Sequence, residues 1–235
     1  MIKRQVQRKM INPKNKTKYR NILASFRKSG KVGKEIQPLS KNRLWEIGQI
    51  ELSGLKRAMF YDLFISAGRV SEILTTTNSE RDVVTDENGE EYYQLDMVNL
   101  KNKSRPRKRV IGYFSDKIER KMIDVILDEL APFGIHEKPY HKVYPQKYKR
   151  IAVTKEYAKI MIQIGIATKQ GIQHIPEVSL FPHLLRHSRA YNLVNQYHYD
   201  ALELTSFMGW TDTRPAMTYC HANTDTFKQK GRFSK

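Results

Sequence analysis

The chain has 235 residues, of which 40% are hydrophobic, enough for one large domain with its own core. Its 42 Lys and Arg against 24 Asp and Glu give a formal net charge of +18. Because so many like charges repel one another and disfavour a compact chain, the excess predicts a polyanionic partner. Nucleic acid is the first candidate and an anionic membrane surface is the second. The chain has no apolar run near the ~20 residues of a membrane helix, and its charged start lacks a signal-peptide core. The single cysteine, Cys220, excludes an internal disulfide and a Cys-rich zinc site, so we expect a cytoplasmic protein.

The first forty residues are strongly basic. Residues 1–41 carry 13 Lys or Arg and one acid, Glu35, and Gly30, Gly33 and Pro38 interrupt them. We expect residues 1–39 to form a basic arm with one helix near Tyr19–Lys28. Such an arm is disordered until it meets nucleic acid, or it is the remnant of a region that clamps DNA.

A helical region follows the arm. Ser40 is a plausible cap for a helix with Leu44, Ile47 and Ile50 on one face. Further helices are expected over Leu55–Ala67 and, after the break at Gly68, over Val70–Thr76.

The pattern then changes to that of strands. Tyr92–Leu100 is β-rich and follows the turn signal Glu87-Asn88-Gly89, and Val110–Phe114 reads as a second strand. Between them, six of the nine residues in Lys101–Arg109 are Lys or Arg. We therefore expect two antiparallel strands joined by a basic turn.

The rest of the chain is predicted to be helical. A helix that starts at Ser115 ends near Ala131-Pro132-Phe133-Gly134. Four more are predicted, over Thr154–Thr168, Pro182–Gln196, Asp200–Met208 and Thr213–His221. The expected fold class is mainly α with a small antiparallel β-sheet (α+β).

Two features of the first half suggest chemistry. Arg69 precedes a predicted helix, and Glu72 lies three residues on, on the same side of a helical turn. A surface ion pair is the plain alternative. The basic turn could contact phosphate without doing chemistry, and its candidate DNA-binding residues are Arg105, Arg107, Lys108 and Arg109.

The segment His183–Ala190 places an imidazole and a guanidinium on one helix face. His183 and Arg186 are three residues apart, and together they can bind a phosphate and share a proton. A helix that merely presents its polar face to solvent is the alternative. His183 and His187 also have the i, i+4 spacing of zinc ligands, but the intervening residues include no acid and no third ligand follows.

Tyr219 lies near the end of the last predicted helix, nine residues after Trp210. It is one of 13 tyrosines, and nothing beside it marks it as more than a partly buried aromatic residue. Its order relative to the other groups is what makes it a candidate.

Taken together, these groups resemble the catalytic signature of the tyrosine recombinase (phage-type integrase) family. The segments GRVSEIL, HLLRHSRA and MGW, with a tyrosine nine residues after the last, are similar to the three family boxes. The resemblance covers residues 40–221, and it implies that this part is a catalytic domain and that residues 222–235 form a C-terminal tail. The signature residues are Arg69, Lys103 or Lys101, His183 with Arg186, Trp210 and Tyr219.

The resemblance implies transesterification at a DNA phosphodiester without metal or other cofactor. Tyr219 would attack phosphorus and form a 3′-phosphotyrosyl bond, so that rejoining needs no ATP. Arg69 and Arg186 would clamp the non-bridging oxygens. Trp210, which stands where most members have histidine, would donate an indole N–H.

The remaining roles concern protons. The resemblance implies that a lysine in the basic turn is the acid that protonates the leaving 5′ oxygen. We favour Lys103, because the pair Lys103-Ser104 matches the Lys-Thr/Ser pair seen in many members of the family, and Lys101 is the fallback. His183 would help to deprotonate Tyr219. Glu72 would orient Arg69 or a neighbouring histidine, with His187 in the same supporting layer.

The partner implied is a double-stranded DNA recombination site, with four protomers on two sites. Members normally carry a separate N-terminal domain that clamps the other face of the DNA, and the arm is too short for it. Two alternatives stay open: a catalytically inactive DNA-binding regulator on the same fold, and a type IB topoisomerase-like nicking and closing enzyme.

Overall fold

The computed structural model describes residues 38–100, 107–144, 152–153, 155–157, 160 and 182–221. All of them belong to one unit, Gln37–Lys235. The predicted arm, except for its last two residues, and the predicted tail 222–235 lie outside the described residues. So do residues 101–106 of the predicted basic turn, which include Lys101, Lys103 and Arg105.

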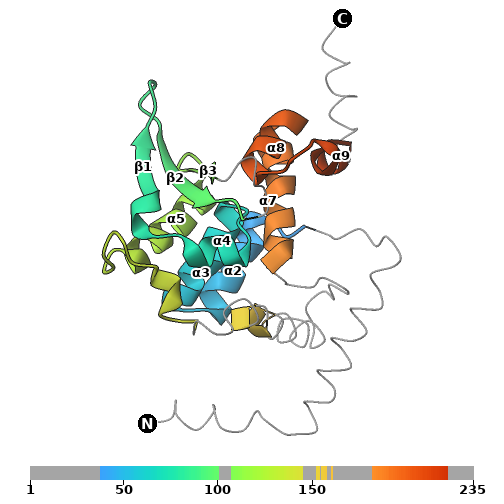
Figure 1. Ribbon diagram of the computed structural model, residues 1–235. Helices are drawn as coiled ribbons and strands as arrows, with labels where there is room; N and C mark the ends of the chain where they lie inside the picture. Colours follow the sequence, from blue (N-terminus) through green and yellow to red (C-terminus); the bar gives the residue numbers. More distant parts are fainter. Residues whose placement is uncertain are drawn as a thin grey trace, which may run out of the picture. The chain divides into compact units, whose positions relative to one another are not determined.

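The first helices occur where the sequence predicted them (Figure 1). Helix α2, Lys41–Glu51, starts after Ser40, whose hydroxyl accepts a hydrogen bond from the Arg43 backbone N–H at 3.3 Å. Helices α3, Gly54–Ile65, and α4, Val70–Thr75, follow. Every residue from Ala58 to Ile65 is buried, so this part of α3 is central in the fold and mostly apolar, and its one charged residue, Asp62, pairs with Arg81 at 2.8 Å.

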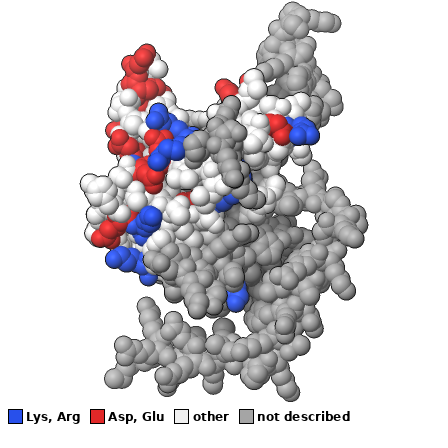
Figure 2. Space-filling model, viewed as in Figure 1, with Lys and Arg blue, Asp and Glu red and all other residues white. Residues whose placement is uncertain are grey.

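The sheet has three antiparallel strands in the order β1–β2–β3. A 3₁₀ turn, Asn78–Glu80, leads into β1, Arg81–Thr85, and β2, Glu91–Val98, pairs with it across the predicted Asn88-Gly89 turn. Strand β1 was not predicted, because it has five residues and its side chains are exposed or only half buried. Figure 2 shows acidic side chains gathered around the turn between β1 and β2.

Strand β3, Arg107–Tyr113, begins earlier than predicted. Arg107–Arg109 were expected in the solvent-facing turn, but these residues pair with β2. Because side chains alternate across a strand, Arg107 and Arg109 face solvent and form ion pairs with Glu80 and Asp96 at 2.6 and 2.9 Å. Lys108 points inward and is buried, which corrects its prediction as an exposed DNA contact.

The second half is helical, as predicted. The elements are α5, Lys117–Leu130, a 3₁₀ turn, Pro139–His141, α7, Pro182–Gln196, α8, Ala201–Met208, and α9, Arg214–His221. The helix predicted over Thr154–Thr168 lies mostly outside the described residues, but Tyr157 and Ile160 are buried in the core. No helix of the described part of the chain is both long and apolar enough to cross a membrane.

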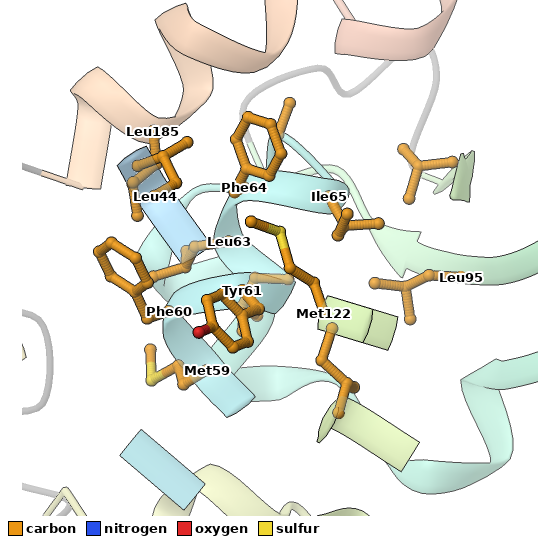
Figure 3. Close-up of a cluster of buried hydrophobic side chains, with 14 of the residues drawn as sticks. Leu44, Met59, Phe60, Tyr61, Leu63, Phe64, Ile65, Leu95, Met122 and Leu185 are labelled. Atoms are coloured by element: carbon orange, nitrogen blue, oxygen red, sulfur yellow. The ribbon is translucent and has the colours of Figure 1, made fainter. Parts of the chain in front are cut away.

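The core gathers around α3 (Figure 3). Leu185 of α7 lies beside Phe64 of α3 and Leu44 of α2, while Met122 of α5 and Leu95 of β2 lie on the other side of α3. Burying each such side chain contributes about 1.5–3 kcal/mol. The core thus packs α7 and the sheet against one central helix.

A buried ion pair fixes α7 further. Arg189 donates from Nη1 and Nη2 to the two carboxylate oxygens of Glu119 on α5, both at 2.7 Å, and neither side chain is exposed. Arg189 also donates to the carbonyl oxygen of Ile111 on β3 at 3.0 Å, and the Tyr197 hydroxyl donates to Glu119 at 2.7 Å. Helix α7 is therefore tied to α5 and to β3, which holds its other residues in place.

Candidate active site

Arg69 is placed by the tight turn between α3 and α4. Ala67 in this turn has a φ of 46°, a left-handed conformation that is uncommon for a residue with a side chain. Arg69 then caps α4, and its backbone N–H and Nη1 donate to the two oxygens of Glu72 at 2.9 and 2.6 Å. The predicted contact between Arg69 and Glu72 is confirmed.

Glu72 is fully buried, and its carboxylate carries a negative charge next to the positive charges of Arg69 and Lys108. Burial raises the pKa of its carboxyl, but the charge of Lys108 and the hydrogen bonds and charge of Arg69 outweigh that effect and hold the pKa below its ordinary value. Glu72 is therefore ionised at neutral pH, and it orients Arg69, which keeps part of its side chain exposed.

Arg186 reaches the same place from α7. Its Nη1 donates to the carbonyl oxygen of Ala67, and its Nη2 donates to that of Met208 at the end of α8, at 2.6 Å. The side chain is 3% exposed. Burial and the nearby charge of Arg69 lower the pKa of Arg186 to about 10, so the guanidinium stays charged at neutral pH. Arg186 thus joins the α3–α4 turn to α8, and its charge lies near that of Arg69.

Trp210 follows Gly209, a position where the backbone conformation favours glycine. Gly209 ends α8 with a φ of 65°, and a Cβ built there would meet Asn99 Nδ2 at 2.5 Å. Asn99, at the end of β2, donates from that atom to the Gly209 carbonyl oxygen at 3.0 Å, and its Oδ1 lies 3.5 Å from Arg69 Nη1. The Trp210 ring then lies 5.7 Å from the Arg186 guanidinium. Asn99 was not predicted, since a lone asparagine at the end of a strand carries no sequence signal.

Tyr219 lies against Trp210 and His187. Its ring is stacked on Trp210, with centroids 6.0 Å apart, and its hydroxyl is hydrogen-bonded to His187 Nδ1. Burial raises the pKa of Tyr219 to about 12, against a smaller lowering by Arg186. Burial, followed by the charge of Arg186, lowers the pKa of His187, so its imidazole is neutral at pH 7 and can accept the phenolic proton.

His183, the histidine predicted to act on Tyr219, lies one turn earlier on α7. Its side chain is exposed, and its ring meets that of His187 edge-on, with centroids 4.6 Å apart. His187, predicted only as a supporting residue, is the one hydrogen-bonded to Tyr219. The two histidines have no third ligand among the described residues, where no group of three His, Cys, Asp or Glu could hold a metal ion.

The structure thus brings six of the predicted residues together. Two guanidinium groups, a carboxylate, an imidazole, an indole and a phenol come from four separate segments of the chain: Arg69 with Glu72, Arg186 with His187, Trp210, and Tyr219. The predicted lysines, Lys101 and Lys103, lie outside the described residues. Two cations beside a phenol that shares its proton with an imidazole can bind a phosphoryl group and present a nucleophile to it.

Comparison with known proteins gives structural likenesses only. No protein-family model matches the sequence, and no curated protein matches it significantly. A XerH site-specific recombinase bound to its difH substrate superimposes with a TM-score of 0.53 at 17% identity, over 85% of this chain and 54% of that one. The chain therefore spans about half the length of XerH.

Two further solved structures agree. The Tn1549 transposon integrase in complex with transposon right end DNA gives a TM-score of 0.55 at 13% identity, over 86% of this chain and 67% of that one. XerA recombinase gives 0.52 at 16% identity, over 86% and 66%. At such identities the likeness concerns the fold. This chain has the mainly helical fold, with a small antiparallel sheet, of tyrosine recombinase catalytic domains.

Proposed function

We propose that this chain is a tyrosine-type site-specific DNA recombinase that cuts and rejoins DNA through a covalent bond to Tyr219. The hydrogen bond between Tyr219 and His187, within a site that also holds Arg69 and Arg186, carries the proposal. A tyrosine that served only to fill the core would not need an imidazole acceptor or two cations beside it. The ordered sequence boxes and the recombinase fold support the same family.

The two arginines suit the charge that develops during phosphoryl transfer. A guanidinium has five N–H donors, and the described contacts of Arg186 use two of its nitrogen atoms as donors to backbone carbonyls. N–H groups therefore remain for a phosphate, as they do on the partly exposed Arg69. Trp210, in contact with Arg186, offers its indole N–H to the same oxygens.

The proton path starts at Tyr219. As its oxygen bonds to phosphorus and the bond to the 5′ oxygen breaks, the phenolic proton passes to His187 Nδ1. This assignment moves the role of base from His183 to His187, and His183 becomes a neighbour that supports the imidazole. The 5′ oxygen takes its proton from a general acid, for which Lys103, with Lys101 as the fallback, remains the proposal.

Duplex DNA is the partner that the charge and the fold favour. The XerH and Tn1549 integrase structures contain their DNA sites, and the net charge of +18 predicts strong, salt-dependent binding of phosphates. Arg105, Arg107 and Arg109 remain proposed DNA contacts. Assembly of four protomers on two sites, within the cell, completes the proposal.

A nicked suicide duplex tests the proposal. The substrate carries the DNA that flanks the gene, with a nick just 3′ of the cleavage position, so that the short fragment with the free 5′-hydroxyl diffuses away after cleavage. The full chain should give a covalent protein–DNA band in denaturing gels, and Tyr219→Phe should give none while binding the duplex equally well. Tight binding with no band for wild type would instead favour an inactive DNA-binding regulator.

A second readout separates recombination from nicking and closing. With two sites on one supercoiled plasmid, the proposed enzyme should give a recombinant product. Relaxation of the plasmid with no recombinant would support the topoisomerase-like alternative.

A further inference from the structure

Lys108 has no role in the chemistry described so far, and it occupies an unusual place. It lies on the inward face of β3, opposite Met97 of β2, and its side chain is 3% exposed. Among the described residues, its Nζ has no hydrogen-bond partner, and it lies 3.6 Å from Glu72 Oε2. An ammonium group has three donors, and burying them unsatisfied is costly.

The charges that face Lys108 come from two helices. Glu72 belongs to α4, Arg69 caps α4, and Arg186 belongs to α7. The arginines beside it on β3 point to the opposite face and pair with acids there. Its aliphatic stem lies against the end of α8, where Lys108 Cδ is 3.1 Å from the place a Cβ on Gly209 would take. Three cations therefore surround one carboxylate.

This environment makes the ammonium form of Lys108 less stable than it is in water while no anion is bound. Burial is the largest effect and the charge of Arg186 adds to it, whereas Glu72 opposes both, and together they lower the pKa of Lys108 to about 7. A phosphodiester between Arg69 and Arg186 would bring a second negative charge, besides that of Glu72, close to Lys108. That charge would favour the ammonium form again.

We propose that Lys108 is a positioning residue that takes up a proton when a DNA phosphodiester binds between Arg69 and Arg186. The charged Lys108 then offsets the charge of Glu72 at Oε2, while Oε1 keeps its contact with Arg69 Nη1, so that the site has a larger positive charge for the phosphate. The proposal rests on the proposed phosphate site, but not on cleavage by Tyr219. Lys108 acts through Glu72, since its ammonium group faces that carboxylate.

A pH dependence of DNA binding follows. Binding that takes up a proton weakens as the pH rises above the pKa of the free state. If the bound-state pKa is two or more units higher, the association constant falls about fivefold from about pH 7 to pH 8. A histidine near the bound phosphate can also take up a proton in this range, so the loss of the slope in Lys108→Met is what assigns the proton to Lys108.

The experiment uses the full chain with Tyr219→Phe, which removes cleavage, and a fluorescently labelled mixed-sequence duplex at constant ionic strength. Anisotropy gives the affinity from about pH 6.5 to pH 9. Calorimetry in buffers of different ionisation enthalpy gives the number of protons taken up. We expect the fivefold fall, and close to one proton taken up on binding at pH 8.

Three variants assign the proton. Lys108→Met keeps the shape of the stem and should remove both the pH slope and the proton uptake. Lys108→Arg, permanently charged, should also remove the slope while keeping at pH 8 the affinity seen near pH 7. Lys142→Met is the matched control, because Lys142 is an exposed lysine 3.6 Å from Glu137, and it should keep the slope.

Two results would overturn the proposal: no proton uptake by the Tyr219→Phe parent, or the same uptake after Lys108→Met. If Lys108→Met fails to fold, the proton uptake of the Tyr219→Phe parent and the pH slope of Lys108→Arg still test the proposal. If the wild-type protein forms no covalent DNA adduct but binding still takes up the expected proton, that result counts against the recombinase function alone. The proposed cleavage by Tyr219 and the proposed proton uptake by Lys108 can therefore fail separately.

Discussion

The hydroxyl of Tyr219 is hydrogen-bonded to Nδ1 of His187, the residue that follows Arg186 on α7. One helix therefore presents both a proton acceptor for the phenol and a cation for the phosphate. The contact also distinguishes Tyr219 from two tyrosines that follow α7: Tyr197 donates to the buried carboxylate of Glu119, and Tyr199 is hydrogen-bonded to Tyr113.

Replacing His187 should slow cleavage without weakening DNA binding. We expect His187→Ala to lower the single-turnover rate of adduct formation by about 10²–10⁴-fold, the usual contribution of a general base. His183→Ala, which removes only the supporting ring, should lower the rate by less. Because the pKa of His187 is lowered, the wild-type rate should fall only below its ordinary value of 6.5. An equal loss in both variants would contradict the assignment of His187.

Gly209 should not tolerate a side chain. Gly209→Ala places a Cβ 2.5 Å from Asn99 Nδ2 and strains a φ of 65°, so we expect it to displace Trp210 and reduce adduct formation at least tenfold. The conformational strain alone costs about 1–2 kcal/mol. Gly89→Ala is the control, because Gly89 has a φ of 81° with nothing within 4 Å of the added Cβ. It should lose similar conformational stability in urea unfolding but no activity, and matched activity in the two variants would refute this role of Gly209.

The buried pair of Arg189 and Glu119 should be sensitive to single changes. Arg189→Met or Glu119→Gln leaves a buried charge without its partner, and each should lower the free energy of unfolding by about 3–5 kcal/mol. The double variant Arg189→Met with Glu119→Gln should cost less than the sum of the two single losses. Denaturant unfolding measures all three. Additive losses would show that the pair does not act as a unit.

Glu72 should make stability depend on pH. Its pKa in the folded state is below the ordinary 4.5, so its stabilisation is fully present above 4.5 and is lost as the pH falls through the folded-state value. Glu72→Gln should therefore lower the free energy of unfolding by about 3 kcal/mol at pH 7. The difference from wild type should shrink toward pH 3 in parallel unfolding curves. A constant difference across this range would mean that the carboxylate charge is not what stabilises the site.

The helices could be predicted because their patterns are strong. The helix over Pro182–Gln196 was assigned its observed bounds, and a capping serine marked the start of α2. Strand β1 was missed because a short strand with no fully buried side chain lacks the alternation that marks a buried strand. The polar Lys108 was misplaced for a related reason: composition made it part of a basic turn, whereas pairing with β2 turns it inward.

The candidate site could be predicted only in part. Order along the chain identified Arg69, Arg186, Trp210 and Tyr219 as members of one set. It could not decide between two histidines one turn apart, because that depends on where α9 places Tyr219. Nor could it find Asn99, whose contacts with Arg69 and Gly209 arise only from the fold.

The most direct measurement identifies the residue that becomes attached to DNA. The adduct formed on a nicked suicide duplex is digested with protease and nuclease, and the modified peptide is sequenced by mass spectrometry. The account predicts a nucleotide linked through its 3′ phosphate to Tyr219. Attachment to another residue, such as Tyr191 or Tyr197, or a 5′ linkage would contradict it.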